Sequence, residues 1–238
     1  MKKFLFVTLL LIAGVYGGVI FNAQRHINDP INPNHVAAQQ AKTSHMLNLK
    51  SEEGLYGWCT GTAIAPHAIL TAEHCAEHGE LSKVALDYGL QDYKVTQILH
   101  DKNEHVILLL DGPALTDIQE YKTREPKIGE HEFFYGFGGK EYPAKLKSGV
   151  VLDEYDPSEA NKANGLMYYS AASIPGDSGA AVYGDDGSML TLVTFHVSQE
   201  YLLTSKAIMG GYALRFTPKQ IEKAKKYVDV RAKHRETV

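Results

Sequence analysis

Short apolar runs separated by turn residues fill the chain from about residue 54 to 215, and this pattern constrains the fold most. Glycine, proline and aspartate bound most of the runs, which lie at 62–64, 68–70, 84–86, 106–110, 133–135, 180–183 and 190–195. Runs this short are typical of β-strands, and with little helix between them they predict a barrel or a sandwich. The sequence Tyr-Gly-Asp-Asp-Gly-Ser at 183–188 predicts a hairpin turn between two strands.

The amino-terminal part of the chain differs from this central part. Residues 1–18 combine two lysines, a short apolar run and small residues, which predicts a secretory signal peptide. A membrane anchor is the less favoured alternative, because the apolar run is shorter than the ~20 residues that a spanning helix needs. Residues 19–53 are polar and rich in turn residues, and we expect a propeptide or an N-terminal extension there.

The carboxyl-terminal segment 217–238 predicts an amphipathic helix. Thr217 is the expected N-cap, Pro218 takes the first helical position, and Gln220 stands where a capping box places it. The apolar residues after it recur at helical spacing: Ile221, Ala224, Tyr227 and Val228.

Composition limits the classes of function. The 238-residue chain carries a formal net charge of -4, with 44% hydrophobic and 22% charged residues, as in an ordinary globular protein. No basic surface for nucleic acid is indicated, and we expect no stable membrane association after signal removal. An exported chain with two nearby cysteines, Cys59 and Cys75, is a candidate for one disulfide, which would contribute about 3 kcal/mol. The predicted location is secreted or periplasmic.

Two segments carry the chemistry. Ser178 lies in Gly176-Asp177-Ser178-Gly179, and His74 precedes Cys75 roughly a hundred residues earlier. Serine is a weak nucleophile until a base takes its proton, and His74 is the candidate base. The glycines let the backbone turn tightly, so that the amides of Gly176 and Ser178 can bind an oxyanion. One such donor is typically worth ~3 kcal/mol of barrier.

Both segments resemble the chymotrypsin/trypsin family of serine peptidases. Residues 57–75 are similar to its cysteine-to-histidine segment, 176–179 to its nucleophile motif, and Gly136-Phe137-Gly138 to a strand end in its second barrel. The resemblance implies an all-β fold of two packed six-stranded antiparallel barrels, at 54–126 and 127–216, with the site in the cleft between them. It also implies a Cys59–Cys75 bridge, a protein or peptide substrate, and no cofactor.

The third member of the triad departs from the family. The family places an aspartate before a strand that corresponds here to 106–109, and the aligned residue is His105. A neutral imidazole there can accept the Nδ1–H of His74, as in the Ser-His-His triads of some viral capsid-maturation proteases, but it adds no charge. A one-residue shift would bring in Glu104 instead, although a strand slip turns its neighbours to the wrong face. Asp101 also lies close by.

That departure leaves a second class of function open. A wrongly set tautomer can cost ~10⁴ in rate, so the second class is a weak or inactive homologue that binds peptides in its cleft.

Asp177, next to the candidate nucleophile, has two interpretations. In zymogens the equivalent aspartate pairs with a new N-terminal amine, whereas many bacterial members keep the residue without such activation.

Specificity rests on the strand at 193–197. His196 there resembles the pocket histidine of glutamyl endopeptidases and of viral polyprotein proteases, with Ser173 as its hydroxyl partner. Ala172 replaces the aspartate with which trypsin binds basic side chains. We therefore expect cleavage after Glu or Gln, the alternative being that His196 is only part of the pocket wall.

A metal site is the remaining alternative. His74-Cys75-Ala76-Glu77-His78 spells H-x-x-E-H, the inverted zinc-peptidase motif. The segment before it is strand-like, Cys75 has a natural partner in Cys59, and Ser178 would remain unexplained. No metal ligand is therefore predicted.

Overall fold

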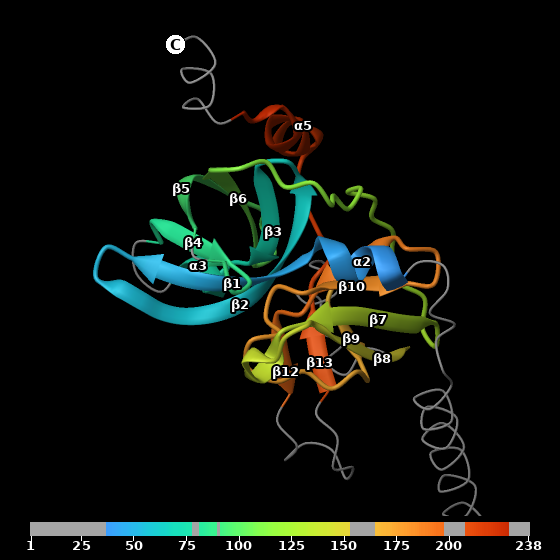
Figure 1. Cartoon of the computed structure of the whole chain (residues 1–238). Coiled ribbons are helices and arrows are strands. Elements are labelled where there is room, and N and C mark those ends of the chain that lie inside the picture. Colours follow the sequence, from blue (N-terminus) through green and yellow to red (C-terminus); the bar gives the residue numbers. More distant parts are fainter. Residues whose placement is uncertain (1–36, 78–80, 90, 153–164, 198–207, 229–238) are drawn as a thin grey trace, which may run out of the picture.

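Two β-barrels lie side by side in the computed structural model, with a helix at the carboxyl-terminal end (Figure 1). The structure describes residues 37–77, 81–89, 91–152, 165–197 and 208–228. The predicted signal peptide lies outside the described residues. Among the described helices, none has the length and apolar character needed to cross a membrane.

The first barrel is closed and has six antiparallel strands in the order β1-β2-β3-β6-β5-β4. Their bounds are β1 Ser44–Ser51, β2 Gly54–Ala65, β3 Ala68–Ala72, β4 Lys83–Leu86, β5 Asp92–His100 and β6 His105–Asp111. Apolar side chains fill its interior, among them Leu47, Ile69 and Leu108, which are fully buried. Removing such side chains from water is the main stabilising contribution of the barrel.

The start of this barrel corrects the predicted boundary at residue 54. Helix α2 (Ala37–Thr43) and strand β1 both form within the segment 19–53 that was expected to be an extension, and β1 pairs with β2 and β4. Met46, Leu47 and Leu49 of β1 are buried among polar neighbours. Because only three apolar residues stand among serine, histidine, asparagine and lysine, the strand resembles a polar segment in the sequence.

The second barrel is nearly closed. Its strands are β7 His131–Gly136, β8 Lys145–Leu152, β9 Met167–Tyr169, β10 Ala181–Gly184, β11 Met189–Leu192, β12 Phe195–Val197 and β13 Ile208–Gly211, in the order β11-β10-β7-β8-β9-β13-β12. The two outer strands, β11 and β12, are consecutive parts of one segment that is interrupted at residues 193–194. Counted as one bent strand, they give six strands, and the predicted pair of six-stranded barrels is confirmed.

An apolar cluster joins the barrels. Ile64 and Leu70 of the first barrel pack in one buried cluster with Phe133 and Tyr183 of the second. The predicted hairpin lies at the edge of this region, between β10 and β11, where Gly187 takes a positive φ of 74° and its amide bonds to the Gly184 carbonyl at 2.9 Å. The shared core fixes the relative position of the strand ends that face each other across the junction.

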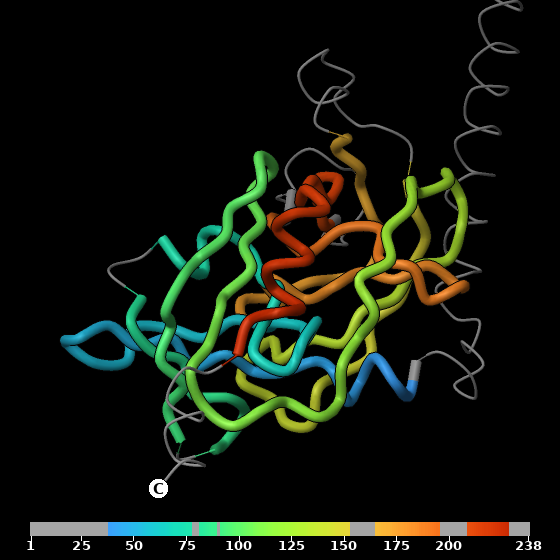
Figure 2. Tube along the Cα trace, turned by 90° about the horizontal axis from the view of Figure 1, so that it is seen from above, coloured from blue at the N-terminus to red at the C-terminus, as the bar shows by residue number. Residues whose placement is uncertain are grey.

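The predicted carboxyl-terminal helix is present as α5 (Pro218–Lys226), but it ends earlier than expected: Tyr227 is its extended C-cap, and Val228 is exposed rather than part of an apolar stripe. Thr217 caps it and forms the capping box with Gln220, as expected from the sequence. Ala224 is buried against the cluster that joins the barrels, with Ile221 and Tyr227 partly buried beside it. Figure 2 shows α5 between the green β5–β6 region and the yellow-green segment that leads to the second barrel.

Candidate active site

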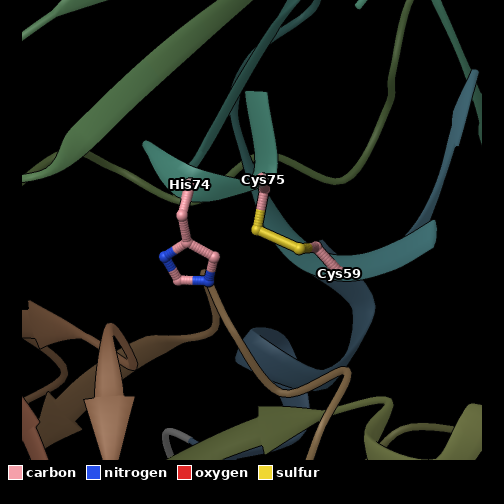
Figure 3. A group of neighbouring side chains, drawn as sticks. All are labelled: Cys59, His74 and Cys75. Carbon is pink, nitrogen blue, oxygen red and sulfur yellow. A yellow bond between two sulfur atoms is a disulfide. The ribbon is translucent and has the colours of Figure 1, made fainter. Parts of the chain in front are cut away.

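His74 lies at the end of the first barrel, at the start of the short helix α3 (His74–Glu77) that follows β3. A disulfide between Cys59 of β2 and Cys75 ties this helix to the barrel, with the two Cα atoms 6.3 Å apart, and so confirms the predicted bridge. Figure 3 shows the His74 imidazole beside the disulfide and directed toward the chain of the second barrel. The helix start and the bridge together fix the backbone from which His74 projects.

Ser178 lies in the turn before β10 of the second barrel, and main-chain contacts hold it against the first. Its carbonyl accepts a hydrogen bond of 2.8 Å from the Thr60 amide and lies 3.8 Å from Cys75 Sγ. Because Cys75 directly follows His74, the fold brings together the two segments that the sequence singled out. They come from different barrels and meet where the barrels join.

Two glycines of the serine turn are required by its geometry. Gly176 and Gly179 take positive φ values of 102° and 85°, which favour glycine. A Cβ on Gly176 would collide with the Trp58 indole nitrogen, and one on Gly179 would collide with the side chain of Thr71. Within the described part of the chain, the amides of Gly176 and Ser178 donate to no other protein group.

Asp177 is fully buried behind the serine turn and accepts three donors. Its Oδ1 accepts the Gly138 amide at 2.9 Å, and its Oδ2 accepts the Ile174 amide at 2.8 Å and the ammonium of Lys147 from β8. An internal cation thus pairs with the carboxylate that zymogens pair with an N-terminal amine. No pattern in the sequence marked Lys147, because one lysine in a strand is ordinary.

His105 is the first residue of β6 and is fully buried. The register pairs it with Ala72 of β3, so it lies beside the backbone that leads into His74. Its Nδ1 is 2.8 Å from Asp101 Oδ2, and its buried Nε2 has no hydrogen-bond partner among the described residues. Glu104 is exposed, and its carbonyl accepts the Glu73 amide at 2.8 Å. At the end of β3, the buried side chain is therefore His105 rather than Glu104.

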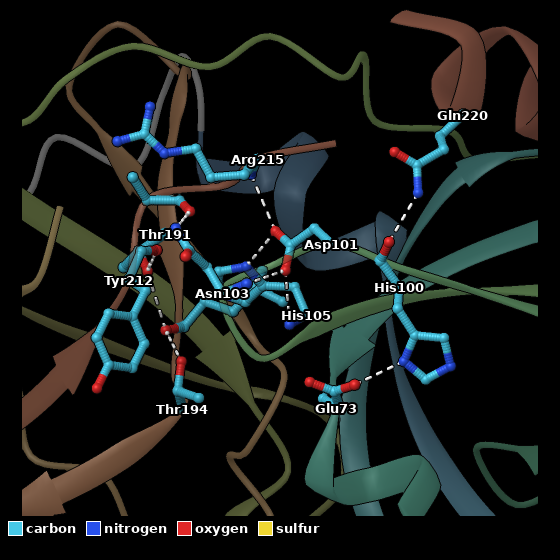
Figure 4. A network of polar contacts seen from close by, with 12 residues as sticks. Glu73, His100, Asp101, Asn103, His105, Thr191, Thr194, Tyr212, Arg215 and Gln220 are labelled. Carbon is cyan, nitrogen blue, oxygen red and sulfur yellow. Dashed lines mark hydrogen bonds and ion pairs between the residues drawn. The ribbon is translucent and has the colours of Figure 1, made fainter. Parts of the chain in front are cut away.

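The Asp101 carboxylate is surrounded by donors (Figure 4). Its Oδ1 accepts the amides of Asn103 and His105 at 2.7 and 3.1 Å, and its Oδ2 accepts the Arg215 amide at 2.9 Å besides the His105 ring. Burial alone would raise the pKa of Asp101, but the bond to His105 and the backbone amides outweigh burial and lower it. Asp101 is therefore a buried carboxylate, a role that the sequence did not indicate beyond its proximity.

The predicted specificity residues are only partly placed. Ser173 is 6% exposed, and its hydroxyl has no partner among the described residues. His196 lies in β12, where its backbone pairs with Met209, but its side chain lies outside the described part of the structure. Ala172, in the position of the trypsin aspartate, is exposed.

The described residues around His74 do not form a usable metal site. Potential ligand atoms of Cys59, His74 and Cys75 lie within 4.8 Å of one another. The two sulfur atoms are bonded to each other, however, and it is the thiolate that binds metals. Of the remaining motif residues, Glu77 is exposed and His78 lies outside the described residues.

Comparison with known proteins identifies the family. The family model of trypsin matches residues 32–202, well over half of the chain. The chain belongs to the trypsin family. Members of this family are serine proteases, which act on proteins or peptides. The chymotrypsin/trypsin resemblance carried by residues 57–75 and 176–179 is thereby confirmed, whereas the likeness to glutamyl endopeptidases is not tested by this match.

Solved structures agree at the level of the fold. A serine endoprotease from Yersinia pestis superposes with a TM-score of 0.59 at 18% identity, over 83% of this chain and 68% of that one. The Rv3671c protease from M. tuberculosis gives 0.59 in its active form and 0.58 in its inactive form, both at 16% identity, with 83% and 82% of this chain and 86% and 94% of those chains covered. No curated protein matches the chain.

Proposed function

We propose that this trypsin-family protein is an exported serine endopeptidase that cleaves peptide bonds with Ser178, His74 and His105. The observation that carries the proposal is the contact of the Ser178 carbonyl with Thr60 and Cys75, which holds the serine turn beside the helix of His74. Export rests on the sequence of residues 1–18, which has the order of charged, apolar and small residues of a signal peptide.

In the proposed reaction, Ser178 Oγ attacks the substrate carbonyl while His74 takes the serine proton. The same proton then passes to the leaving amine, and water repeats the cycle on the acyl-enzyme. The amides of Gly176 and Ser178 bind the oxyanion of each tetrahedral intermediate. The positive φ of Gly176 and the buried pair of Asp177 with Lys147 support this assignment, because they hold the turn that carries both amides.

His105 completes the proposed triad by accepting the Nδ1–H of His74. The register that places His105 opposite Ala72 supports this role, because it brings His105 beside the backbone that leads into His74. His105 Nε2 is buried and makes no hydrogen bond to His74 in the structure, so the proposed bond forms when a substrate is bound. The exposed side chain of Glu104 argues against the one-residue shift. The absence of a carboxylate at position 105 favours the second candidate function, a weakly active homologue that holds peptides in its cleft.

Labelling with a fluorophosphonate probe tests the proposal. The purified mature protein is expected to react with one probe per chain, because only an activated serine attacks the phosphorus at a useful rate. The Ser178→Ala variant, with an unchanged circular dichroism spectrum, is expected to lose the label completely. A folded wild-type protein that takes no label, or labelling that persists in the variant, would contradict the assignment and favour the peptide-binding homologue.

We further propose that the enzyme cleaves after Glu or Gln. The buried, unpartnered hydroxyl of Ser173 and the place of His196 in β12 support a pocket that donates hydrogen bonds to a carboxylate or amide. In a peptide series that varies only the residue before the scissile bond, kcat/KM for Glu or Gln is expected to exceed that for Leu or Lys by at least about tenfold. Ser173→Ala should reduce the ratio of kcat/KM for Glu or Gln to that for Leu or Lys. Equal kcat/KM values of the wild type across the series would refute the proposed specificity.

A further inference from the structure

We infer that Asp101 is a positioning residue that sets the proton positions on two imidazoles in series, His105 and His74. The inference deepens the proposed function, on which its kinetic test rests. The last group of the hydrogen-bonded series is then a carboxylate. It lies one imidazole ring further from the serine than an aspartate at position 105 would.

The first step is the tautomer of His105. Asp101 receives four hydrogen bonds, three of them from the backbone amides of Asn103, His105 and Arg215. A buried carboxylate in this setting can only accept hydrogen bonds, so the fourth bond, from His105 Nδ1 at 2.8 Å, requires the ring hydrogen on Nδ1. The Nε2 of neutral His105 is then an acceptor.

The second step is the place of that acceptor. Nε2 lies on the opposite side of the ring from Asp101, is buried, and has no hydrogen-bond partner among the described residues. His45 Nε2 and His67 Nδ1 are also buried without a partner among the described residues, but only His105 is paired in register with the strand end that leads into His74. His105 is paired in register with Ala72, two residues before His74. The His74 ring makes no hydrogen bond to His105 Nε2 in the structure, but catalytic hydrogen bonds often form only in the complex with substrate. We therefore take the His74 ring as the donor that reaches this nitrogen when a substrate is bound.

The third step carries the effect to the serine. An acceptor at His105 Nε2 selects the His74 tautomer with its hydrogen on Nδ1. His74 Nε2 then presents its lone pair for the Ser178 proton, as a general base must. One fixed carboxylate therefore determines the tautomers of both rings.

A second carboxylate–imidazole pair at the same end of the barrel provides a matched control. Glu73 Oε1 lies 2.6 Å from His100 Nδ1, but His100 is 52% exposed, and Gln220 bonds to its backbone carbonyl rather than to its ring (Figure 4). Water can satisfy either tautomer of an exposed ring. The pair at Asp101 differs because both of its side chains are fully buried.

The variant Asp101→Asn tests the inference. If the asparagine NH₂ group takes the place of Oδ1, it faces two other donors, the backbone amides of Asn103 and His105. If it takes the place of Oδ2, it faces one backbone donor, the Arg215 amide. The second orientation is therefore preferred. The NH₂ group then donates to His105 Nδ1, which places the ring hydrogen of His105 on Nε2. With a donor at His105 Nε2, His74 Nδ1 must act as an acceptor. The hydrogen of His74 then lies on Nε2, which can no longer accept the serine proton.

We expect Asp101→Asn to lower kcat on the best peptide of the series about 10²- to 10³-fold, with KM changed less than about threefold. Nitrogen-15 NMR of the histidine rings should show the hydrogen of His105 on Nδ1 in the wild type and on Nε2 in the variant. Glu73→Gln should keep kcat within about twofold of the wild type. In a His105→Asp background, Asp101→Asn should cost less than about tenfold, because the intervening ring is gone.

Three results would overturn the inference. The first is a kcat for Asp101→Asn within about threefold of the wild type, and the second is a wild-type His105 ring that carries its hydrogen on Nε2. The third is a fall in kcat with no change of the His105 tautomer, which would leave Asp101 a merely structural role. If the wild type takes no probe and cleaves no peptide, the proposed function fails, whereas the wild-type tautomer still decides the role of Asp101. The same measurement decides it if Asp101→Asn does not fold.

Discussion

Replacing Lys147 with methionine is expected to destabilise the protein by about 3 kcal/mol and to lower kcat roughly 10²-fold. The substitution leaves the fully buried carboxylate of Asp177 with two amide donors, from Gly138 and Ile174, and without its cation. An uncompensated buried charge either moves toward water or takes up a proton. Since Asp177 lies between Gly176 and Ser178, a move of its side chain displaces the amides proposed to bind the oxyanion.

Urea unfolding gives the stability change, and peptide hydrolysis gives kcat. Lys145→Met is the matched control: it lies on the same strand, is 54% exposed, and pairs only at 3.9 Å with the exposed Glu141. A surface pair of this kind contributes little, so the control should stay within about 0.5 kcal/mol of the wild type. If Lys147→Met behaves like Lys145→Met in both measurements, the buried pair does not hold the serine turn.

The parts of the fold that sequence predicted are those with local signals. The strand pattern, the hairpin at 183–188 and the capping box at Thr217 each depend on residues a few positions apart. The disulfide and the meeting of the His74 and Ser178 segments rested on family motifs, each of which is continuous in the chain. Strand β1 was missed because its three apolar residues, Met46, Leu47 and Leu49, are few and stand among polar ones without the alternation typical of a strand.

What the sequence could not show is the pairing of single residues across the fold. Lys147 meets Asp177 from another strand, and the Arg215 amide reaches Asp101 from the segment before α5. Nothing in the sequence near Lys147 or Arg215 marks the Lys147 side chain or the Arg215 backbone amide as a partner of a buried acid. Such pairs depend on the register and packing of the whole barrel, which local patterns do not specify.

Three buried carboxyl groups differ in the number of hydrogen-bond donors that they receive. Asp101 and Asp177 each receive several donors, whereas Glu132 of β7, which is also fully buried, receives from the described residues only the Ala171 amide, at 3.1 Å. Its Oε2 has no hydrogen-bond partner among the described residues. Burial raises the pKa of Glu132 to about 8, although the Ala171 bond lowers it slightly. The native protein therefore keeps a neutral Glu132 at pH values where the unfolded chain ionises it.

This difference predicts a loss of stability with rising pH. Below pH 4.5, the ordinary value, Glu132 is protonated in both states and makes no pH-dependent contribution. Between pH 4.5 and about 8, only the unfolded chain releases the proton, so ionisation stabilises the unfolded state progressively. By pH 7 the penalty amounts to about 3 kcal/mol.

Glu132→Gln should remove this penalty, because glutamine is uncharged in both states and its Oε1 can keep the Ala171 bond. We expect the free energy of unfolding of the variant, relative to the wild type, to rise by about 3 kcal/mol between pH 4.5 and pH 7. Urea titrations across this range measure the difference directly, and Glu120→Gln, at an exposed carboxylate, should run parallel to the wild type. Parallel curves for Glu132→Gln as well would mean that Glu132 ionises in the native protein with a partner or a water molecule of its own.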